Sequence, residues 1–330
     1  MIRRFALLGC LLLACSKEGP APAPPDAIAP TAEPAPSSDQ VLPARFEADR
    51  IFLELRTAEG QSLRLFTDTG GGLYLHDHVA ERLGLAVEQA RGDGGQPLEV
   101  VSLPPLHPDT PMPPVTVLDG RLPVAHAAPF GDVFGDGILG QGWFRERVWT
   151  FDYGAQTLVL HEAAPGCDDG HELPLGFQEQ DGRRTASYPR IQAEVDGQTL
   201  DLLLDTGATV LLTESGLAAL GDGGPAERAT SFVVRSVFDR WRAAHPDWPV
   251  IEAADRMADD PMIEVPAVTV GGLRVGPVWF TARDDPNFHE YMSQWMDRRI
   301  DGALGGSALR YLRLTVDYPG ARACLRALGS

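Results

Sequence analysis

The chain has 330 residues, of which 44% are hydrophobic, and a formal net charge of −18 at pH 7. This length is sufficient for two domains that each bury a core. The acidic balance excludes nucleic acid as a partner, because no basic stripe is present to neutralise phosphates. Frequent Gly and Pro, together with short apolar runs in place of long helical periodicities, predict a mainly β protein.

The first residues have the pattern of a secretion signal. Arg3-Arg4 precede a short apolar run that ends in Leu12-Leu13-Ala14-Cys15, and this run is too short to span a bilayer. The last four residues resemble a bacterial lipobox. We therefore expect residues 1–14 to be a lipoprotein signal peptide and the Cys15 thiol to carry the lipid; an ordinary cleaved signal is the alternative.

The following segment, residues 15–44, is rich in Pro and Ala and has no periodicity. Such a composition cannot bury enough apolar area to fold, and Pro favours extended chain. We expect a disordered tether that holds a folded part off the membrane. This organisation implies a lipid-anchored protein of the bacterial cell envelope, with the outer membrane, facing the periplasm or the surface, favoured by Ser16 after the cysteine.

The chain contains four cysteines. Cys10 lies in the expected signal peptide and Cys15 is assigned to the lipid, which leaves Cys167 and Cys324 in an oxidising compartment. They are available to form a disulfide. The sequence leaves open whether they do, because the distance between their Cα atoms is unknown.

Two copies of the tripeptide Asp-Thr-Gly stand at the ends of short apolar segments. Residues 202–204, three leucines, lead into Asp205-Thr206-Gly207, and residues 63–67 lead into Asp68-Thr69-Gly70. An apolar run of this kind indicates a buried strand, and Asp before Gly indicates a turn at its end. One such motif is a weak signal, since both residues are common in turns. Two on similar segments indicate a duplicated unit built around two carboxylates.

The sequence around the two motifs repeats. In each half an alternating run, 51–55 or 191–195, is followed by a turn and by the apolar segment before the Asp. The second turn contains Asp196-Gly197, which is a strong hairpin signal. Each half then ends on an apolar-apolar-Gly segment, Ile138-Leu139-Gly140 or Ala303-Leu304-Gly305. We expect one lobe at 45–165, a linker at 166–186, and a second lobe at 187–330 with an insertion at about 225–262.

In order and spacing these segments resemble an aspartic protease of the pepsin/retropepsin type. Leu204 to Thr209 matches the family's active-site motif closely, and Phe66 to Gly72 matches it through the glycine. The two apolar-apolar-Gly segments match the strands that cross behind the active-site loops. The likeness covers about residues 48–326 and is closer to retropepsin domains fused in tandem. It implies a mainly β fold of two retropepsin-like β-barrel lobes with a cleft between them.

The resemblance also implies an activity, the hydrolysis of peptide bonds by an aspartic endopeptidase. Asp68 and Asp205 would form the catalytic dyad, because two carboxylates this close hold one proton between them and activate a water. The substrate would be a peptide or protein. No cofactor and no metal is expected, and no homodimer is needed to complete the site, because both acids lie on one chain.

The loops that carry the dyad would be supported by four further residues. By the resemblance, Thr69 and Thr206 bond across the lobes, while Gly70 and Gly207 allow the turn that brings backbone N–H groups toward the carboxylates. Gly71 and Ala208 stand where pepsins have a hydroxyl residue. Losing a donor raises the pKa of a carboxylate pair, so we expect a working pH less acidic than that of pepsin.

Two features leave a second function open, that of a non-catalytic envelope lipoprotein that binds peptides in the same cleft. The first motif departs from the family after its glycine, and the expected flap, about residues 94–114, contains no Tyr. One aromatic- and Met-rich segment has helical spacing that favours a core-facing helix, with substrate contact as the alternative; its members are Phe288, Tyr291, Met292, Trp295 and Met296.

Overall fold

The computed structural model describes residues 39–92, 95–126 and 131–329, and these belong to one compact unit. The signal peptide expected at 1–14, the lipid site at Cys15 and the tether up to residue 38 lie outside the described residues. Within the described part, no helix is long and apolar enough to cross a membrane.

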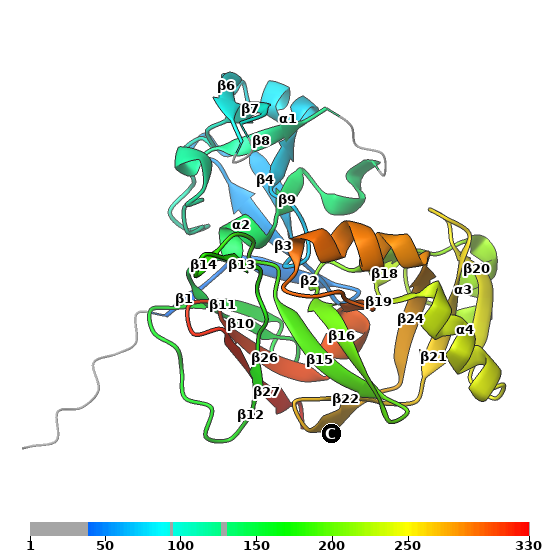
Figure 1. Ribbon diagram of the computed structural model, residues 1–330. Coiled ribbons are helices and arrows are strands. Elements are labelled where there is room, and N and C mark those ends of the chain that lie inside the picture. Colours follow the sequence, from blue (N-terminus) through cyan, green and yellow to red (C-terminus); the bar gives the residue numbers. More distant parts are fainter. Residues whose placement is uncertain (1–38, 93–94, 127–130, 330) are drawn as a thin grey trace, which may run out of the picture. The chain divides into compact units, whose positions relative to one another are not determined.

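The expected mainly β fold with two lobes is confirmed, and three large sheets build it (Figure 1). These sheets remain open and do not close into barrels. The sheet of the first lobe has the order β2 (Ala44–Glu47), β3 (Arg50–Arg56), β4 (Ser62–Thr67), β9 (Gly137–Leu139), β5 (Tyr74–His76), β8 (Leu122–Ala125), β7 (Pro97–Val101) and β6 (Glu88–Arg91).

The second lobe has a sheet of nine strands. Its order is β20 (Val250–Asp255), β21 (Asp260–Val265), β24 (Val278–Arg283), β19 (Ser231–Val234), β25 (Gly302–Leu304), β16 (Gln198–Leu204), β15 (Arg190–Val195), β22 (Val268–Val270) and β23 (Leu273–Val275). The continuous apolar end of β16 follows from its place between β15 and β25, because a central strand is buried on both faces. Leu202, Leu203 and Leu204 are accordingly 0–1% exposed.

A third sheet joins the two halves of the chain. It contains β1 (Gln40–Val41), β11 (Thr157–His161), β10 (Val148–Asp152), β26 (Leu312–Asp317), β27 (Arg322–Ala327) and β12 (His171–Pro174), in this order. At its centre β10 and β26 run antiparallel with Thr150 opposite Thr315. These residues are 165 positions apart, and their hydroxyls are 2.7 Å from each other. An internal twofold axis therefore passes between them.

Short helices and two small hairpins complete the lobes. The helices are α1 (Asp77–Arg82), η1 (Leu118–Gly120), η2 (Gly131–Phe134), α2 (Gln141–Phe144), α3 (Glu214–Leu220), α4 (Arg235–Ala244), η3 (Asn287–Tyr291), η4 (Met292–Trp295) and α5 (Gly306–Leu309), and the hairpins pair β13 (Glu179–Gln180) with β14 (Arg183–Arg184) and β17 (Thr209–Leu211) with β18 (Glu227–Ala229). β5 pairs in parallel with β8 and antiparallel with β9, and β19 pairs in the same way with β24 and β25. The two strands are therefore equivalent. The β17–α3–β18 segment, which precedes β19, has no counterpart before β5 among the described residues of the first lobe.

The structure departs from the expected segment boundaries at the tether, the linker and the insertion. The end of the predicted tether is folded, because β1 pairs with β11 and β2 begins at Ala44. The predicted linker 166–186 contains β12 and the β13–β14 hairpin. The β17–α3–β18 segment, residues 209–229, overlaps only the start of the insertion expected at 225–262.

Cys167 and Cys324 form a disulfide, with their Cα atoms 5.8 Å apart and 157 positions between them in the sequence. Because closing so long a loop restricts the unfolded chain, replacing both cysteines by Ser is expected to lower the free energy of unfolding by about 2–5 kcal/mol. Urea denaturation of the wild type and the double variant, both without reductant, measures this. Coincident unfolding midpoints would contradict it.

Candidate active site

The structure places both predicted aspartates directly after equivalent strands. Asp68 follows β4 and Asp205 follows β16. Each of these strands pairs in parallel with a strand from the end of its own lobe, β9 or β25. The pairing continues into the loops, since the Asp68 N–H donates to the Leu139 carbonyl and the Asp205 N–H to the Leu304 carbonyl, both at 3.0 Å. The apolar-apolar-Gly segments thus support the loops from behind.

The threonines of the two motifs connect the lobes through hydrogen bonds. The Thr69 N–H donates to the Thr206 hydroxyl at 3.1 Å, and the Thr206 N–H donates to the Thr69 hydroxyl at 3.0 Å. The Thr69 hydroxyl also donates to the Leu204 carbonyl at 2.7 Å, and the Thr206 hydroxyl to the Thr67 carbonyl at 3.4 Å. Both side chains are fully buried. This reciprocal arrangement fixes the loops relative to each other.

The carboxyl groups of Asp68 and Asp205 meet at this junction and share a hydrogen bond. Each also accepts a hydrogen bond at 2.9 Å from the N–H of its own loop glycine, Gly70 or Gly207. The glycines are required by this close approach. A Cβ on Gly70 would lie 2.6 Å from Cγ of Asp205, and a Cβ on Gly207 would lie 2.1 Å from Cγ of Asp68.

The environment favours retention of a proton by the pair. Burial, then the charge of Asp205, raises the pKa of Asp68 well above its usual range. Burial also raises the pKa of Asp205, although hydrogen bonds from Asp68 and from the N–H groups of Gly207 and Ala208 oppose this. Neither residue 71 nor residue 208 has a hydroxyl to stabilise a second negative charge. Burial and mutual proximity therefore disfavour the state in which both carboxyls are ionised, and the two groups titrate as one unit.

Sequence reasoning missed a tyrosine beside the dyad. In the hairpin of β15 and β16, Arg190 lies opposite Leu203, and continuing this register by two residues places Tyr188 opposite Asp205. The partly buried Tyr188 has its pKa raised to about 12, by burial and then by the charges of Asp68, Tyr291 and Asp205. Extending the predicted hairpin past its first strand would have found it.

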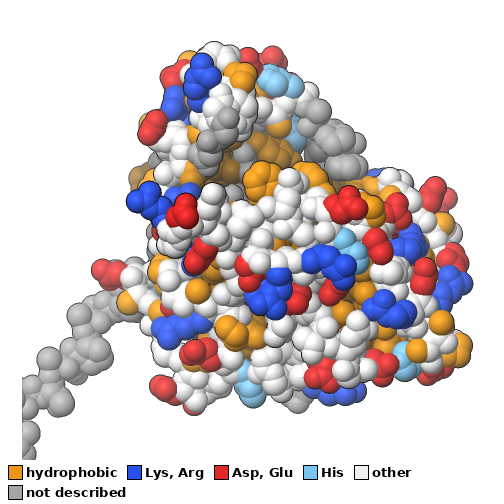
Figure 2. Space-filling model, in the orientation of Figure 1, with side chains coloured by type: hydrophobic (Ala, Val, Ile, Leu, Met, Phe, Trp, Pro, Cys, Tyr) orange, Lys and Arg blue, Asp and Glu red, His pale blue; other side chains and the backbone are white. Residues whose placement is uncertain are grey.

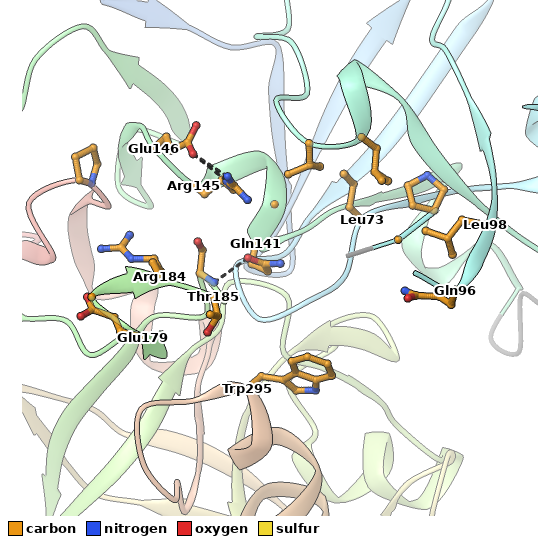
Figure 3. A pocket seen from close by; sticks show the side chains of 18 residues that line it. Leu73, Gln96, Leu98, Gln141, Arg145, Glu146, Glu179, Arg184, Thr185 and Trp295 are labelled. Atoms are coloured by element: carbon orange, nitrogen blue, oxygen red, sulfur yellow. Dashed lines mark hydrogen bonds and ion pairs between the residues drawn. The ribbon is translucent and has the colours of Figure 1, made fainter. Parts of the chain in front are cut away.

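A cavity of about 820 Å³, here called the first cavity, is lined by residues of both lobes, and neither Asp68 nor Asp205 is among them. Its walls include Leu73, three residues after the first Asp-Thr-Gly, and Gln141, whose side-chain oxygen accepts a hydrogen bond from the Ser187 N–H at 2.9 Å. Figure 3 shows Leu73, Gln96 and Leu98 on one side of the cavity and Glu179, Arg184 and Thr185 on the other. The lining combines apolar side chains with the charged groups of Arg145, Glu146, Glu179 and Arg184.

The β6–β7 hairpin contributes Gly92, Gln96 and Leu98 to the lining of this cavity. It starts earlier than the flap expected at 94–114, and the proline-rich residues 104–114 form a separate loop. The aromatic- and Met-rich segment is divided. Phe288 and Met296 are buried, whereas Tyr291 is 67% and Trp295 45% exposed, so the segment serves both core and surface.

Trp295 lines the first cavity, and hydrophobic side chains gather along the boundary between first-lobe and second-lobe elements (Figure 2). The partly exposed indole of Trp295 in η4 is therefore available to a ligand in the cavity. Among the described residues, no group of three or more His, Cys, Asp or Glu side chains is arranged to hold a metal ion.

The threonine bonds should contribute strongly to stability. Replacing Thr69 or Thr206 by Val leaves a buried backbone N–H of the other lobe without its acceptor, which costs about 1–3 kcal/mol of unfolding free energy. Chemical denaturation measures the loss. Thr199→Val, at an exposed position of β16, is the matched control and should change stability by less than about 0.5 kcal/mol; equal effects in all three variants would contradict the assignment.

The raised pKa of Asp68 predicts a pH-dependent effect of Asp68→Asn. The folded chain retains a proton that the unfolded chain releases near pH 4, so stability is lost as the pH rises through the folded-state pKa. Asn does not ionise, and the variant should be more stable than the wild type at pH 7, with a smaller difference toward pH 3.

Urea midpoints at pH 3 and pH 7 test this sign. Hydrogen bonds from Arg228 lower the pKa of the exposed Asp222, so Asp222→Asn should show the opposite sign and be less stable than the wild type at pH 7. A stability difference for Asp68→Asn that is the same at both pH values would contradict the raised pKa.

Comparison with known proteins shows the fold alone. No family model and no curated protein matches the sequence. The aspartic proteinase from Irpex lacteus is similar in structure, with a TM-score of 0.50 and 10% identity over 88% of this chain and 98% of that chain.

Two 7S globulins are also similar in structure, each at 10% identity. Conglutin gamma, a basic 7S globulin from lupine, has a TM-score of 0.47 over 89% of this chain and 96% of that chain. Basic 7S globulin from soybean has a TM-score of 0.43 over 88% and 95%. Taken with the sheets and the paired loops, the comparison with the proteinase shows that the chain has a bilobal, pepsin-like fold.

Proposed function

We propose that the protein is an aspartic endopeptidase in which Asp68 and Asp205 activate a water for attack on a peptide carbonyl. The observation that carries the proposal is the meeting of two equivalent carboxyls, one from each lobe, in a buried, hydrogen-bonded pair whose pKa values are both raised. If both aspartates served only as turn residues, the fold would not need to bury their carboxyls against each other. Such burial is costly, because it raises the pKa of both groups.

The pair supplies both a base and an acid. The ionised carboxylate accepts a proton from the water as the water oxygen attacks the carbonyl carbon. The protonated carboxyl donates its proton to the carbonyl oxygen, which gives a neutral gem-diol intermediate. When this intermediate collapses and the C–N bond breaks, the newly protonated carboxyl donates its proton to the leaving amine nitrogen. A hydroxyl of the gem-diol returns its proton to the other carboxylate, which regenerates the singly protonated pair.

The surroundings support binding of an extended peptide. The β6–β7 hairpin lines the first cavity together with Leu73 and Trp295. Tyr188 lies beside the dyad and supplies a phenol near the reacting groups. The β6–β7 hairpin of the first lobe contains no tyrosine. We further propose, from the sequence pattern at residues 1–15, that Cys15 carries a lipid and that the enzyme acts in the bacterial cell envelope.

A second function, peptide binding without hydrolysis, has one observation in its favour. Residues 71 and 208 provide no hydroxyl to the carboxyls, and a Cβ on Gly71 would lie 2.3 Å from Oδ2 of Asp68. The first loop therefore cannot gain such a donor by simple substitution. The cavity and the exposed aromatic side chains would serve a binding protein equally well.

Digestion of a peptide library by the full chain tests the proposal. Cleavage in the wild type, with its maximum above pH 3, should fall by at least about 10²–10⁴-fold in Asp68→Asn and in Asp205→Asn. Asp247→Asn, at an exposed position, is the control and should cleave like the wild type. Absence of cleavage from pH 2 to pH 8 with peptide binding retained would establish the second function, and cleavage that survives both substitutions would contradict the dyad.

A further inference from the structure

A second cavity, of about 640 Å³, occupies the position that the internal twofold axis predicts from the first. Arg145 lines the first cavity and Arg310 the second, and these residues are separated by the same 165 positions as Thr150 and Thr315. Each cavity thus begins at the short helix, α2 or α5, that follows the apolar-apolar-Gly segment of one lobe.

Each cavity also receives a residue from the opposite lobe, and these two residues occupy equivalent positions. Ser187, next to Tyr188, lines the first cavity, and Asp49 lines the second. In the first lobe Phe52 lies opposite Phe66, so the same register places Arg50, the neighbour of Asp49, opposite Asp68. Both cavities are therefore at the lobe boundary, on opposite sides of the dyad.

The second cavity is lined by apolar and charged side chains, and Glu264 lies among apolar side chains. Trp279 and Glu264 lie directly opposite each other in the antiparallel pair of β24 and β21, so both side chains project from the same face of the sheet. Met262, two residues before Glu264, lies on that face as well, and Leu220 and Val250 add further apolar surface.

The charges around the cavity leave this carboxylate without a cation. Arg228 pairs with Asp222 at 2.5 Å, and Arg310 lies 3.6 Å from Asp49. Within the described part of the chain, the side chain of Glu264 has no ion pair and no hydrogen bond. The titratable lining of Asp49, Asp222, Arg228, Glu264 and Arg310 therefore carries one formal negative charge in excess.

The first cavity differs in this respect. There Arg145 pairs with Glu146 at 2.8 Å, and Glu179 lies near Arg184. Two acidic groups thus face two basic groups, with no excess. The two ends of the boundary are alike in construction and different in charge.

We propose that the second cavity binds the side chain of a lysine or arginine residue of a peptide. The cationic group would pair with Glu264 and lie against the Trp279 ring, while its methylene groups contact Met262 and Val250. An aromatic face and a carboxylate together select a cation over a neutral side chain of similar length. The inference rests on the proposed function only in that a peptide is the ligand. It does not require hydrolysis, so it applies equally to a peptide-binding protein without activity.

Binding measurements on the full chain with Asp205→Asn, which removes hydrolysis, test the proposal. Fluorescent peptides that differ only in lysine, arginine or norleucine at one position, scanned along an otherwise neutral sequence, are compared by anisotropy at low ionic strength. When the variable residue is at one of the scanned positions, the lysine and arginine peptides should bind at least about tenfold more tightly than the norleucine peptide. This preference should disappear when Glu264→Gln is added.

Two further variants separate a local role from a general charge effect. Trp279→Leu should reduce the preference for the cationic peptides several-fold. Glu252→Gln, which removes an exposed acid of β20 that pairs with Arg242, should leave the preference unchanged. Equal affinity for all peptides, no binding by any of them, or an equal loss in the Glu252 and Glu264 variants overturns the inference, whether or not the wild type cleaves peptides.

Discussion

The hydrogen bonds between Thr69 and Thr206 are the constraint on which the rest of the site depends. Each threonine donates from its backbone to the other hydroxyl, and one hydroxyl then donates at 2.7 Å to the Leu204 carbonyl, just before Asp205. Because these groups are buried, a change in the position of one lobe would leave several of them unpaired. The junction therefore holds the two carboxyls within bonding distance, although they disfavour each other when both are ionised.

The internal symmetry extends this junction to the whole molecule. The same twofold axis passes between Thr150 and Thr315 in the shared sheet and between the two active-site loops. It also relates the two cavities, which explains why each is built from both lobes. The departures from symmetry are then informative, since the β17–α3–β18 segment and the uncompensated Glu264 occur only in the second lobe and make the two ends of the boundary chemically different.

Much of the fold could be predicted from the sequence because the repeat specifies it twice. The hairpins expected at 51–66 and 191–204 are confirmed as β3–β4 and β15–β16, since period-two patterns and the Asp196-Gly197 turn are local signals. The meeting of Asp68 with Asp205 followed from the family resemblance. The tether boundary was wrong at its end, because pairing of β1 with β11 depends on a distant strand and leaves no local signal. Glu264 was missed because the register between β21 and β24 determines what it faces. Tyr188 was missed although a local signal existed, because the predicted β15–β16 hairpin was not extended to the residue opposite Asp205.

The central claim is that the two buried carboxyls share one proton, and a carboxyl titration tests it most directly. With ¹³C-labelled aspartate, NMR of the wild type should show two coupled carboxyls at the site, one of which stays protonated well above the usual range for Asp. In Asp205→Asn this coupling should be lost, and Asp68 should titrate in a single step. If Asp68 and Asp205 both ionise independently near pH 4 in the wild type, the account of the site is contradicted.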